Sequence, residues 1–268
     1  SNENIAPLLL QGLNLLEYRG YDSSGLIVLS ENNLFIRARS VGKVKCLEKK
    51  INSGFEEING NIGIAHVRWA THGEPSNYNA HPHISKNTVS VVHNGIIENY
   101  LELKDNQILK GYEFTSDTDT EVIAHEIDLE MNSCDSFLLA TQKALKSLQG
   151  SYGLGIISSK YPNQLIAAKK GSPLVIGISK KGNYIASDQM ALLSRTKDFI
   201  FLEDGDIAVI KLDKVTIYDQ GGNLVKREMR TSMLKEGQVS KGPYKHFMQK
   251  EIFEQPQAIR DTLESRIT

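Results

Sequence analysis

The hydrophobic positions of the chain change period several times, and each change predicts a different element. Residues 3–17 carry apolar side chains at helical spacing, and Gly20 then provides a stop signal. The stripe on this predicted helix consists of Ile5, Leu8, Leu9, Leu13 and Leu16. From residue 24, SGLIVL and LFIRARSV have the pattern of strands. A short helix is predicted at KVKCLEKKI, followed by strands at NIGIAHV and TVSVVHN.

Two further helices and a long series of strands are predicted in the second half. Thr118 and Glu121 have the spacing of a capping box, which predicts a helix N-terminus there, and another helix is predicted at 136–148. The later strands are SYGLGIIS, QLIAAKK, PLVIGIS, NYIASD, FIFL, DIAVIKL and KVTIYD. DQGGN predicts a hairpin turn, and helix returns after Pro256. This order predicts an α+β fold of two antiparallel sheets with segregated helices, and it lacks the alternation of a Rossmann fold.

Composition limits the class of protein. The chain has 268 residues with 31 basic and 32 acidic side chains, a formal net charge of −1, which argues against a nucleic-acid-binding surface. It contains no apolar run long enough for a membrane helix, and neither a GxGxxG fingerprint nor a P-loop, so we expect no membrane contact and no cofactor. Cys46 and Cys134 form no CxxC pair, and they are interpreted as free, incidental thiols of a cytoplasmic protein.

The stretch HVRWATHGEPSNYNAHPH, residues 66–83, is predicted to be a long functional loop between two strands. It holds four of the seven histidines and the only tryptophan. His81 and His83 form an H-x-H pair that could bind a metal ion, but the only acidic residue within 66–93 is Glu74. The favoured alternative is that the imidazoles bond to backbone groups and fix the shape of the loop.

Two other features each allow a structural and a functional interpretation. Asn94-Gly95 is typical of a hairpin turn, but an Asn amide and a Gly N–H can also form an oxyanion hole. Asp119 is placed to interact favourably with a helix dipole, and its functional interpretation is a carboxylate that binds a ligand ammonium group. Arg68 would then be the matching fork for a ligand carboxylate. An arginine and an aspartate together are what an α-amino acid requires at its two charged ends.

Six segments resemble the glutaminase domain of the glutamine–fructose-6-phosphate aminotransferase family, which belongs to the class II glutamine amidotransferases. They are LEYRGYDSSG (16–25), HVRWATHGEPSNYNAHPH (66–83), VVHNGIIENY (91–100), SDTDTEVIAH (116–125), GSPLVIG (171–177) and IASDQMALL (185–193). The tail HFMQKEIFEQP resembles the family's segment leading toward its sugar-isomerase domains. The resemblance implies an N-terminal-nucleophile fold, a four-layer αββα sandwich. It also implies hydrolysis of L-glutamine to glutamate and ammonia, with the ammonia passed to fructose 6-phosphate to give glucosamine 6-phosphate.

The resemblance also implies roles for the residues that match the family's motifs. Asn94 and Gly95 match the oxyanion hole, and Arg68 matches the residue that holds the glutamine α-carboxylate, assisted by Thr71 and His72.

Asp119 matches the residue that holds the α-ammonium group, and Trp69 lies where the family controls the ammonia route. Arg19 and His81 lie in motifs that border the site. Residues 1–239 are expected to form the glutaminase domain, and 240–268 a segment leading toward sugar-isomerase domains of the same full-length chain. The full-length enzyme is expected to be a homo-oligomer.

The family's nucleophile is an N-terminal cysteine at the start of a CGIVG strand. Its thiolate forms a thioester, and its α-amine, with a pKa of about 7.7–8.0, serves as base. This chain begins SNENIAPLLL, so we expect the 268 residues alone to be inactive, with Ser1 not replacing the cysteine. The alternatives are a non-catalytic glutamine- or glutamate-binding module, a class II glutaminase serving another acceptor, and a histidine-ligated metallohydrolase.

Overall fold

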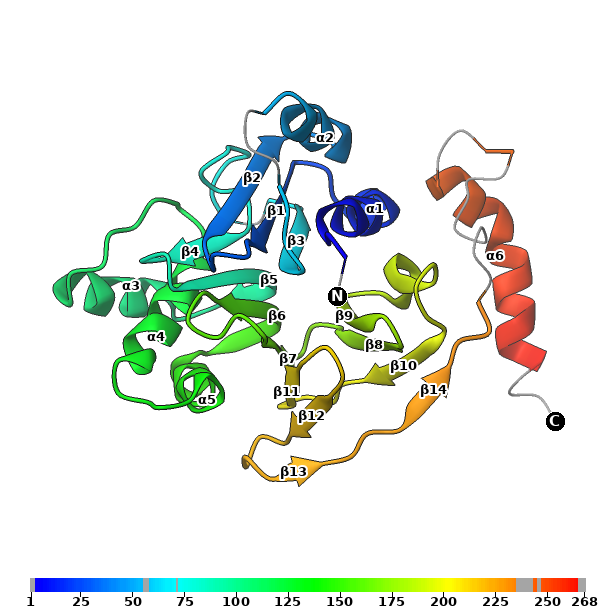
Figure 1. Cartoon of the computed structure of the whole chain (residues 1–268). Helices are drawn as coiled ribbons and strands as arrows, with labels where there is room; N and C mark the ends of the chain where they lie inside the picture. The colour runs from blue at the N-terminus through cyan, green and yellow to red at the C-terminus, as the bar shows by residue number, and fades with distance from the viewer. Residues whose placement is uncertain (1–2, 55–57, 71, 235–242, 245–246, 265–268) are drawn as a thin grey trace. The chain divides into compact units, whose positions relative to one another are not determined.

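The computed structural model describes residues 3–54, 58–70, 72–234, 243–244 and 247–264 (Figure 1). The chain divides into two compact units, Ser1–Met233 and Leu234–Thr268, whereas the sequence placed a boundary after residue 239. The second unit contains α6 (Phe247–Glu264), and the other described helices and strands lie in the first. No helix in the described ranges is both long and apolar enough to cross a membrane.

The largest layer is a seven-stranded antiparallel sheet with the order β13-β12-β11-β7-β6-β5-β4. Its strands are β4 (His83–Ser85), β5 (Val89–Ile97), β6 (Gly150–Ser158), β7 (Leu165–Lys170), β11 (Ile207–Ile210), β12 (Val215–Tyr218) and β13 (Leu224–Val225). One face is covered by α3 (Tyr100–Leu109), α4 (Glu121–Met131) and α5 (Phe137–Ser147). Ile123 and Ile127 of α4 and Phe137 of α5 are fully buried against Leu154 and Ile156 of β6, which fixes these helices on the sheet.

Two smaller antiparallel sheets lie on the other face. The first has the order β2-β1-β3, with β1 (Ser23–Leu29), β2 (Phe35–Val41) and β3 (Ile62–Arg68). The second has the order β14-β10-β8-β9, with β8 (Val175–Ser179), β9 (Gly182–Ala186), β10 (Asp198–Phe201) and β14 (Met229–Thr231). Ile64 of β3 shares a buried hydrophobic cluster with Val92 of the large sheet, and Ile176 of β8 shares another with Ala208. These contacts form the core between the two sheet layers.

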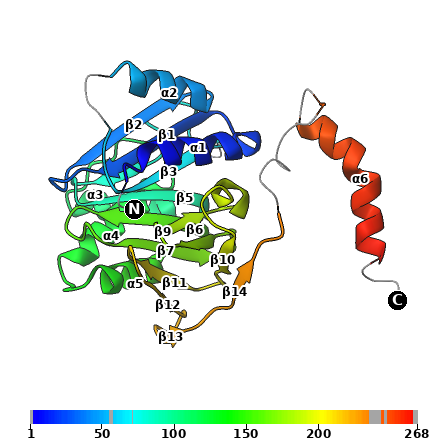
Figure 2. The ribbon, with the colours of Figure 1, turned by 45° about the vertical axis from the view of Figure 1, so that its right-hand side comes forward.

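The outer face of the three-stranded sheet is covered by α1 (Ala6–Leu16) and α2 (Val44–Asn52) (Figure 2). Two short 3₁₀ helices, η1 (Glu17–Arg19) and η2 (Gln189–Leu192), come after α1 and β9. The layers are therefore helix, sheet, sheet and helix, so the predicted α+β fold and its four-layer αββα arrangement are confirmed. The two predicted antiparallel sheets are three among the described residues, because one sheet layer is divided into a three-stranded and a four-stranded sheet.

Several local predictions were wrong for identifiable reasons. The capping box fails because α4 begins at Glu121, whose carboxylate instead accepts hydrogen bonds from the backbone N–H groups of Thr115 and Ser116. Helix α3 was missed because Leu101, Ile108 and Leu109 face solvent, so its apolar residues form no buried stripe.

The C-terminal helix was placed too late. Helix α6 begins at Phe247 and continues through Pro256, whereas the sequence placed helix only after the proline.

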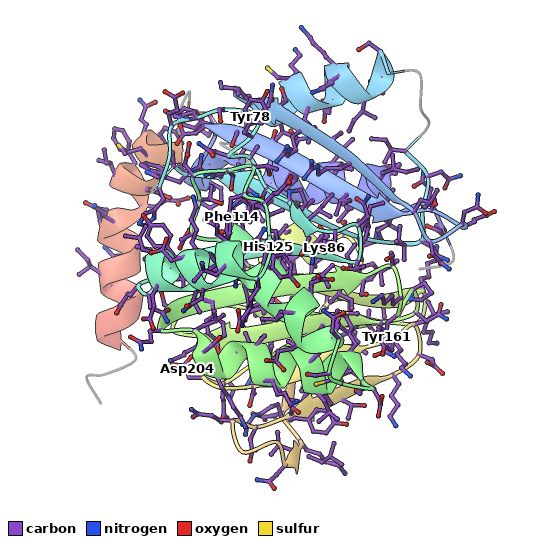
Figure 3. All side chains as sticks on the ribbon, turned by 90° about the vertical axis from the view of Figure 1, so that its left-hand side faces the viewer. Tyr78, Lys86, Phe114, His125, Tyr161 and Asp204 are labelled. Atoms are coloured by element: carbon purple, nitrogen blue, oxygen red, sulfur yellow. The ribbon has the colours of Figure 1, made fainter. Side chains whose placement is uncertain are left out.

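The outer helical layer also accounts for one histidine that has no place in the site. His125 of α4 lies against Phe114, with ring centroids 4.7 Å apart, and its Nδ1 is 2.9 Å from Oγ of Ser85 (Figure 3). The ammonium group of Lys86 lies 3.8 Å from the ring centroid of Tyr112 in the same region. His125 is therefore a buried packing residue, enclosed between the helix and the edge of the sheet.

Candidate active site

The Asn94-Gly95 pair lies inside β5 and not in a turn. Asn94 is aligned with Gly153 and Gly95 with Tyr152 across the antiparallel pairing of β5 and β6. The φ of Gly95 is +137°, and a Cβ added there would collide with the carbonyl oxygen of Ser151. The hairpin interpretation is therefore wrong, and this strand position requires glycine because any side chain would strike β6.

The side chain of Asn94 is held by a histidine from the opposite sheet. Nε2 of His66, on β3, lies 2.9 Å from Oδ1 of Asn94. Both residues line a cavity between the sheets, and Asn94 is half-buried there. The sequence did not single out His66, and only its place at the end of a predicted strand could have pointed to it.

Arg68 is the last residue of β3, and its side chain is directed into the loop after that strand. It is 3% exposed, and its guanidinium donates hydrogen bonds to the carbonyl oxygens of His72, Gly73 (3.1 Å) and Glu74 (3.4 Å). Burial lowers the pKa of Arg68, while the carboxylates of Asp22 and Asp119 act in the opposite direction. Arg68 is thus a buried cation within electrostatic reach of Asp119, as the amino-acid interpretation requires.

The rest of the loop is fixed by residues that the sequence did not identify. Nδ2 of Asn79 donates to the carbonyl oxygen of Glu74 at 3.0 Å, and its Oδ1 accepts from the N–H of Asp117 at 2.9 Å. The carboxylate of Asp22 accepts from the N–H of Ala70 at 2.8 Å. These bonds connect the loop to the start of β1 and to the segment before α4.

Two arginines of β2 hold the second half of the loop. Arg39 donates to the carbonyl oxygens of Tyr78 (3.1 Å) and Ala80 (3.0 Å), and Arg37 donates to that of Pro82 (3.2 Å). Their i, i+2 spacing in LFIRARSV was the available signal, because residues two apart lie on the same face of a strand. Burial lowers the pKa of Arg39 to about 10.

Asp119 lies in the turn before α4 and is 4% exposed. Its Oδ2 accepts a hydrogen bond from the backbone N–H of Ile97, at the end of β5, at 2.8 Å. No hydrogen bond from a described residue to Oδ1 is seen. The carboxylate therefore contacts the strand that carries Asn94 and Gly95, and the helix-dipole interpretation does not describe its contact.

Three of the loop histidines, His66, His81 and His83, have pKa values lowered by burial and are uncharged at neutral pH. The rings of His66 and His81 are stacked with centroids 4.2 Å apart, and the His83 ring lies edge-on to His81 at 4.9 Å. Burial lowers the pKa of His66 to about 4, and it lowers the pKa values of His81 and His83 well below the usual range. Over the described residues, no group of three or more His, Cys, Asp or Glu side chains is arranged to hold a metal ion.

The remaining predicted site residues differ in position. Trp69 is 67% exposed, so most of its side chain lies in solvent. The His72 ring lies 5.3 Å from that of Tyr100, at the start of α3. Thr71 lies outside the described residues, as does the side chain of Arg19, whose backbone is part of η1. The structure thus brings together Asn94, Gly95, Arg68, Asp119 and His81.

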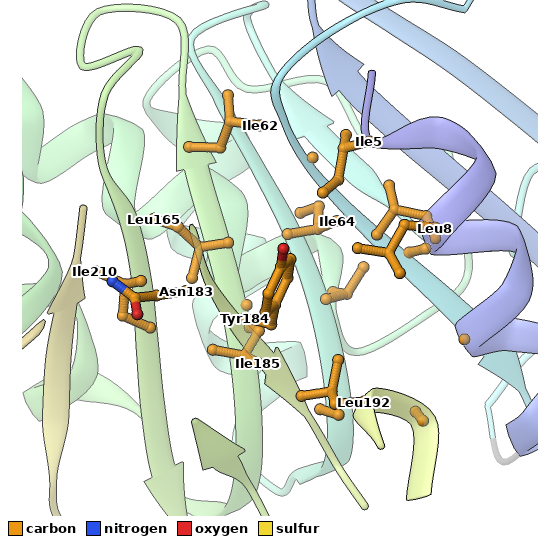
Figure 4. Close-up of a pocket in the computed structure, with 18 of the residues that line it drawn as sticks. Ile5, Leu8, Ile62, Ile64, Leu165, Asn183, Tyr184, Ile185, Leu192 and Ile210 are labelled. Carbon is orange, nitrogen blue, oxygen red and sulfur yellow. The ribbon is translucent and has the colours of Figure 1, made fainter. Parts of the chain in front are cut away.

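A cavity of about 620 Å³ opens beside Asn94 and His66 (Figure 4). It lies between β3, the outer strand of one small sheet, and β9, the outer strand of the other. Its apolar lining comes mainly from α1, β3 and β9, and includes Leu8, Ile64 and Tyr184. The cavity therefore separates two strand edges that no described strand pairs with.

Known proteins of similar sequence are glutamine amidotransferases. The protein-family model described as a glutamine amidotransferase domain matches residues 66–194 of the sequence, the segment that holds Arg68, Asn94 and Asp119. The chain is 52% identical over 267 residues to glutamine–fructose-6-phosphate aminotransferase (isomerizing) of Haemophilus influenzae. It is 49% identical over 268 residues to the enzyme of the same name from Escherichia coli. Residues 66–194 therefore belong to the glutamine amidotransferase domain family.

The two relatives are much longer than this amidotransferase domain. The match covers 100% of the chain but only 43% and 44% of the relatives, so the chain spans less than half of their length. Glutamine phosphoribosylpyrophosphate amidotransferase of B. subtilis has a similar fold, with a TM-score of 0.69 over 83% of this chain and 48% of that one. At 23% identity this likeness shows the four-layer sandwich fold alone.

Proposed function

We propose that this domain is the glutaminase half of a glutamine–fructose-6-phosphate aminotransferase. It would hydrolyse L-glutamine to L-glutamate and ammonia, and the ammonia would be transferred to fructose 6-phosphate elsewhere in the full-length protein. The observation that carries the proposal is the placement of a buried cation, Arg68, and a buried carboxylate, Asp119, beside the Asn94-Gly95 strand. The names of relatives that are about half identical over the whole chain support the acceptor.

Substrate binding follows from the two charges. The guanidinium of Arg68 would bind the α-carboxylate of glutamine, with Thr71 and His72 beside it, and Oδ1 of Asp119 would accept from the α-ammonium group. Because Asp119 is bonded to Ile97, an ammonium held there would place the side-chain carboxamide near Asn94 and Gly95.

Chemistry at the carboxamide would use an N-terminal cysteine. Its α-amine accepts the thiol proton, and the thiolate attacks the carbonyl carbon, giving an oxyanion that Nδ2 of Asn94 and the N–H of Gly95 stabilise. The C–N bond then breaks, the α-ammonium returns the proton, and ammonia leaves a thioester. Water hydrolyses the thioester to glutamate and restores the thiol.

The cavity supports the position of that cysteine. An extended segment between β3 and β9 could pair with both strand edges and bury its apolar side chains against Leu8, Ile64 and Tyr184. Its end would lie beside Asn94, which lines the same cavity. We therefore propose that a segment preceding Ser1 in the full-length protein occupies this space.

The remaining features of the whole protein belong to the same proposal. Trp69 would lie along the ammonia route, and Arg19 and His81 would support the border of the site. Residues 240–268 would lead to a sugar-isomerase domain, and the full-length protein would be a cytoplasmic homo-oligomer.

The test uses the full-length protein, with glutamate, ammonia and glucosamine 6-phosphate measured after addition of glutamine and fructose 6-phosphate. We expect all three products, and we expect none after the N-terminal cysteine is replaced by alanine. Binding of glutamine without hydrolysis would support the non-catalytic module instead. Hydrolysis without glucosamine 6-phosphate would indicate another acceptor. A covalent adduct of the 268-residue chain with a glutamine-like electrophile would contradict the assignment of the nucleophile.

A further inference from the structure

The contact between His66 and Asn94 joins the two sheet layers at the proposed oxyanion hole. His66 lies on β3 of the three-stranded sheet, and Asn94 lies on β5 of the seven-stranded sheet. The 2.9 Å distance between Nε2 of His66 and Oδ1 of Asn94 is that of a good hydrogen bond. The other ring nitrogen of His66, Nδ1, is buried and forms no hydrogen bond of acceptable geometry with a described residue. The backbone of His93 has only a small effect on the pKa of His66, which it raises.

The unpartnered Nδ1 determines where the single imidazole proton lies. Burying an N–H group without a hydrogen-bond acceptor has a high free-energy cost. Burying an unprotonated ring nitrogen without a donor has a lower cost. Burial lowers the pKa of His66 to about 4, so the ring is neutral and has one N–H. That N–H is therefore at Nε2, and it donates to Oδ1 of Asn94.

The neighbouring histidines have a consistent proton arrangement. The backbone N–H of His93 donates to Nδ1 of His81 at 3.3 Å, which leaves the His81 proton on Nε2, 3.4 Å from Oγ1 of Thr120. The Thr120 hydroxyl then donates to Nδ1 of His93 at 3.1 Å, and Nε2–H of His93 donates to the carbonyl oxygen of Ser151 at 3.2 Å. Because His66 is stacked on His81, this network fixes the plane of its ring.

The consequence for Asn94 is a fixed amide orientation. Its Oδ1 is occupied by His66, so its Nδ2 faces away, and no described residue hydrogen-bonds to that nitrogen. We propose that His66 is a positioning residue for glutamine hydrolysis, which holds Asn94 with its NH₂ group, and not its oxygen, directed at the developing oxyanion. This inference rests on the proposed role of Asn94 and Gly95. A flipped amide would present lone pairs to the negative oxygen and oppose the reaction.

Two matched substitutions of His66 in the full-length protein test the proposal. Glutamine places its side-chain NH₂ close to the position of imidazole Nε2, whereas asparagine places it close to Nδ1. We expect His66→Gln to retain kcat for glutamine hydrolysis within about threefold. We expect His66→Asn to lower kcat by about 10–100-fold with KM within about twofold, because a misdirected oxyanion donor loses much of the 10²–10³-fold that such donors provide.

A second comparison separates positioning from a general structural role. In an Asn94→Ala background the orientation of the amide no longer matters, so adding His66→Asn should change kcat by less than about twofold. An aldehyde analogue of glutamine forms a tetrahedral adduct with the thiol, and the oxygen of this adduct lies where the oxyanion forms. In His66→Asn the inhibition constant of this analogue should rise by the same factor as kcat falls. Inhibition by glutamate should not weaken.

Three outcomes would overturn the inference: equal losses in the Gln and Asn variants, a His66→Asn loss that persists fully in the Asn94→Ala background, or a rise in KM that matches the fall in kcat. Each requires a wild-type protein that hydrolyses glutamine. An inactive wild type would instead refute the proposed function.

Discussion

The backbone N–H of Ile97 donates a hydrogen bond to Oδ2 of Asp119 at 2.8 Å, so the carboxylate joins the turn before α4 to the end of the strand that carries Asn94 and Gly95. One oxygen of Asp119 has a structural contact, and the other is the one proposed to accept from the ligand ammonium group. The two contributions can therefore be separated by substitution.

Asp119→Asn keeps an acceptor for the Ile97 N–H but removes the negative charge. In the full-length protein we expect KM for glutamine to rise at least about 10-fold, since a charge-assisted bond is lost, with the free energy of unfolding within about 1 kcal/mol of wild type. Asp119→Ala should raise KM similarly and cost a further ~1–3 kcal/mol, because the buried N–H loses its partner. Kinetics and urea unfolding of both variants provide the measurement. Equal stability of the two variants would contradict the structural role.

Gly95→Ala should be severely destabilising. An alanine would be strained by the φ of +137°, and its Cβ would overlap the Ser151 carbonyl oxygen. Because both effects destabilise the fold, we expect a loss of more than about 3 kcal/mol in the free energy of unfolding. Gly111→Ala is the matched control, because Gly111 has a φ of +82° but no atom within 4 Å of an added Cβ. It should cost only about 1 kcal/mol. Similar costs at the two positions, measured by urea unfolding, would show that the collision is unimportant.

Arg68→Lys should loosen the loop and weaken glutamine binding together. A lysine ammonium cannot reproduce the fork that contacts the His72, Gly73 and Glu74 carbonyl oxygens, so we expect faster proteolysis within residues 69–79. KM for glutamine should rise by about 10-fold or more, as a bidentate carboxylate contact is lost. Arg230→Lys is the control, because Arg230 forms an exposed pair with Glu228. It should change neither the cleavage rate nor KM.

The buried imidazoles should make stability depend on pH. Their folded pKa values lie below the ordinary value of 6.5, so the unfolded chain binds protons that the folded chain does not. This contribution is complete above about pH 6.5 and is lost as pH falls, until about pH 4 for His66. Urea unfolding at about pH 7 and pH 5 should show a smaller difference for His81→Gln than for wild type, by roughly 1–2 kcal/mol. An unchanged or larger difference would mean that His81 does not titrate as its burial requires.

Much of the fold was predictable because its strands and helices carry regular apolar patterns. Strands β1, β5 and β6 are buried on both faces and are therefore rich in apolar and β-branched residues, and α1 has a clear stripe. Helix α3 has no such signal because Leu103 is buried but Leu101, Ile108 and Leu109 are exposed, so no apolar stripe forms.

The site was predictable only where a motif named the residue. Arg68, Asn94, Gly95 and Asp119 lie in family motifs, and the structure brings them together. The supporting contacts of His66, Asn79 and Asp22 were not predictable, because each joins residues distant in sequence through a geometry that no local pattern encodes.

The strand edges of β3 and β9 face each other across the cavity, and a segment seated there would join the three-stranded and four-stranded sheets into one continuous sheet. The proposed nucleophile would then begin the strand that holds the two halves of that layer together. Removing this segment would abolish glutamine hydrolysis. It would also leave the unpaired backbone groups of β3 and β9 free to pair with strands of other molecules. An inactive reference protein should therefore be made by substituting the side chain of the N-terminal cysteine. A deletion of the segment would cause aggregation as well as loss of activity, and the two effects could not be separated.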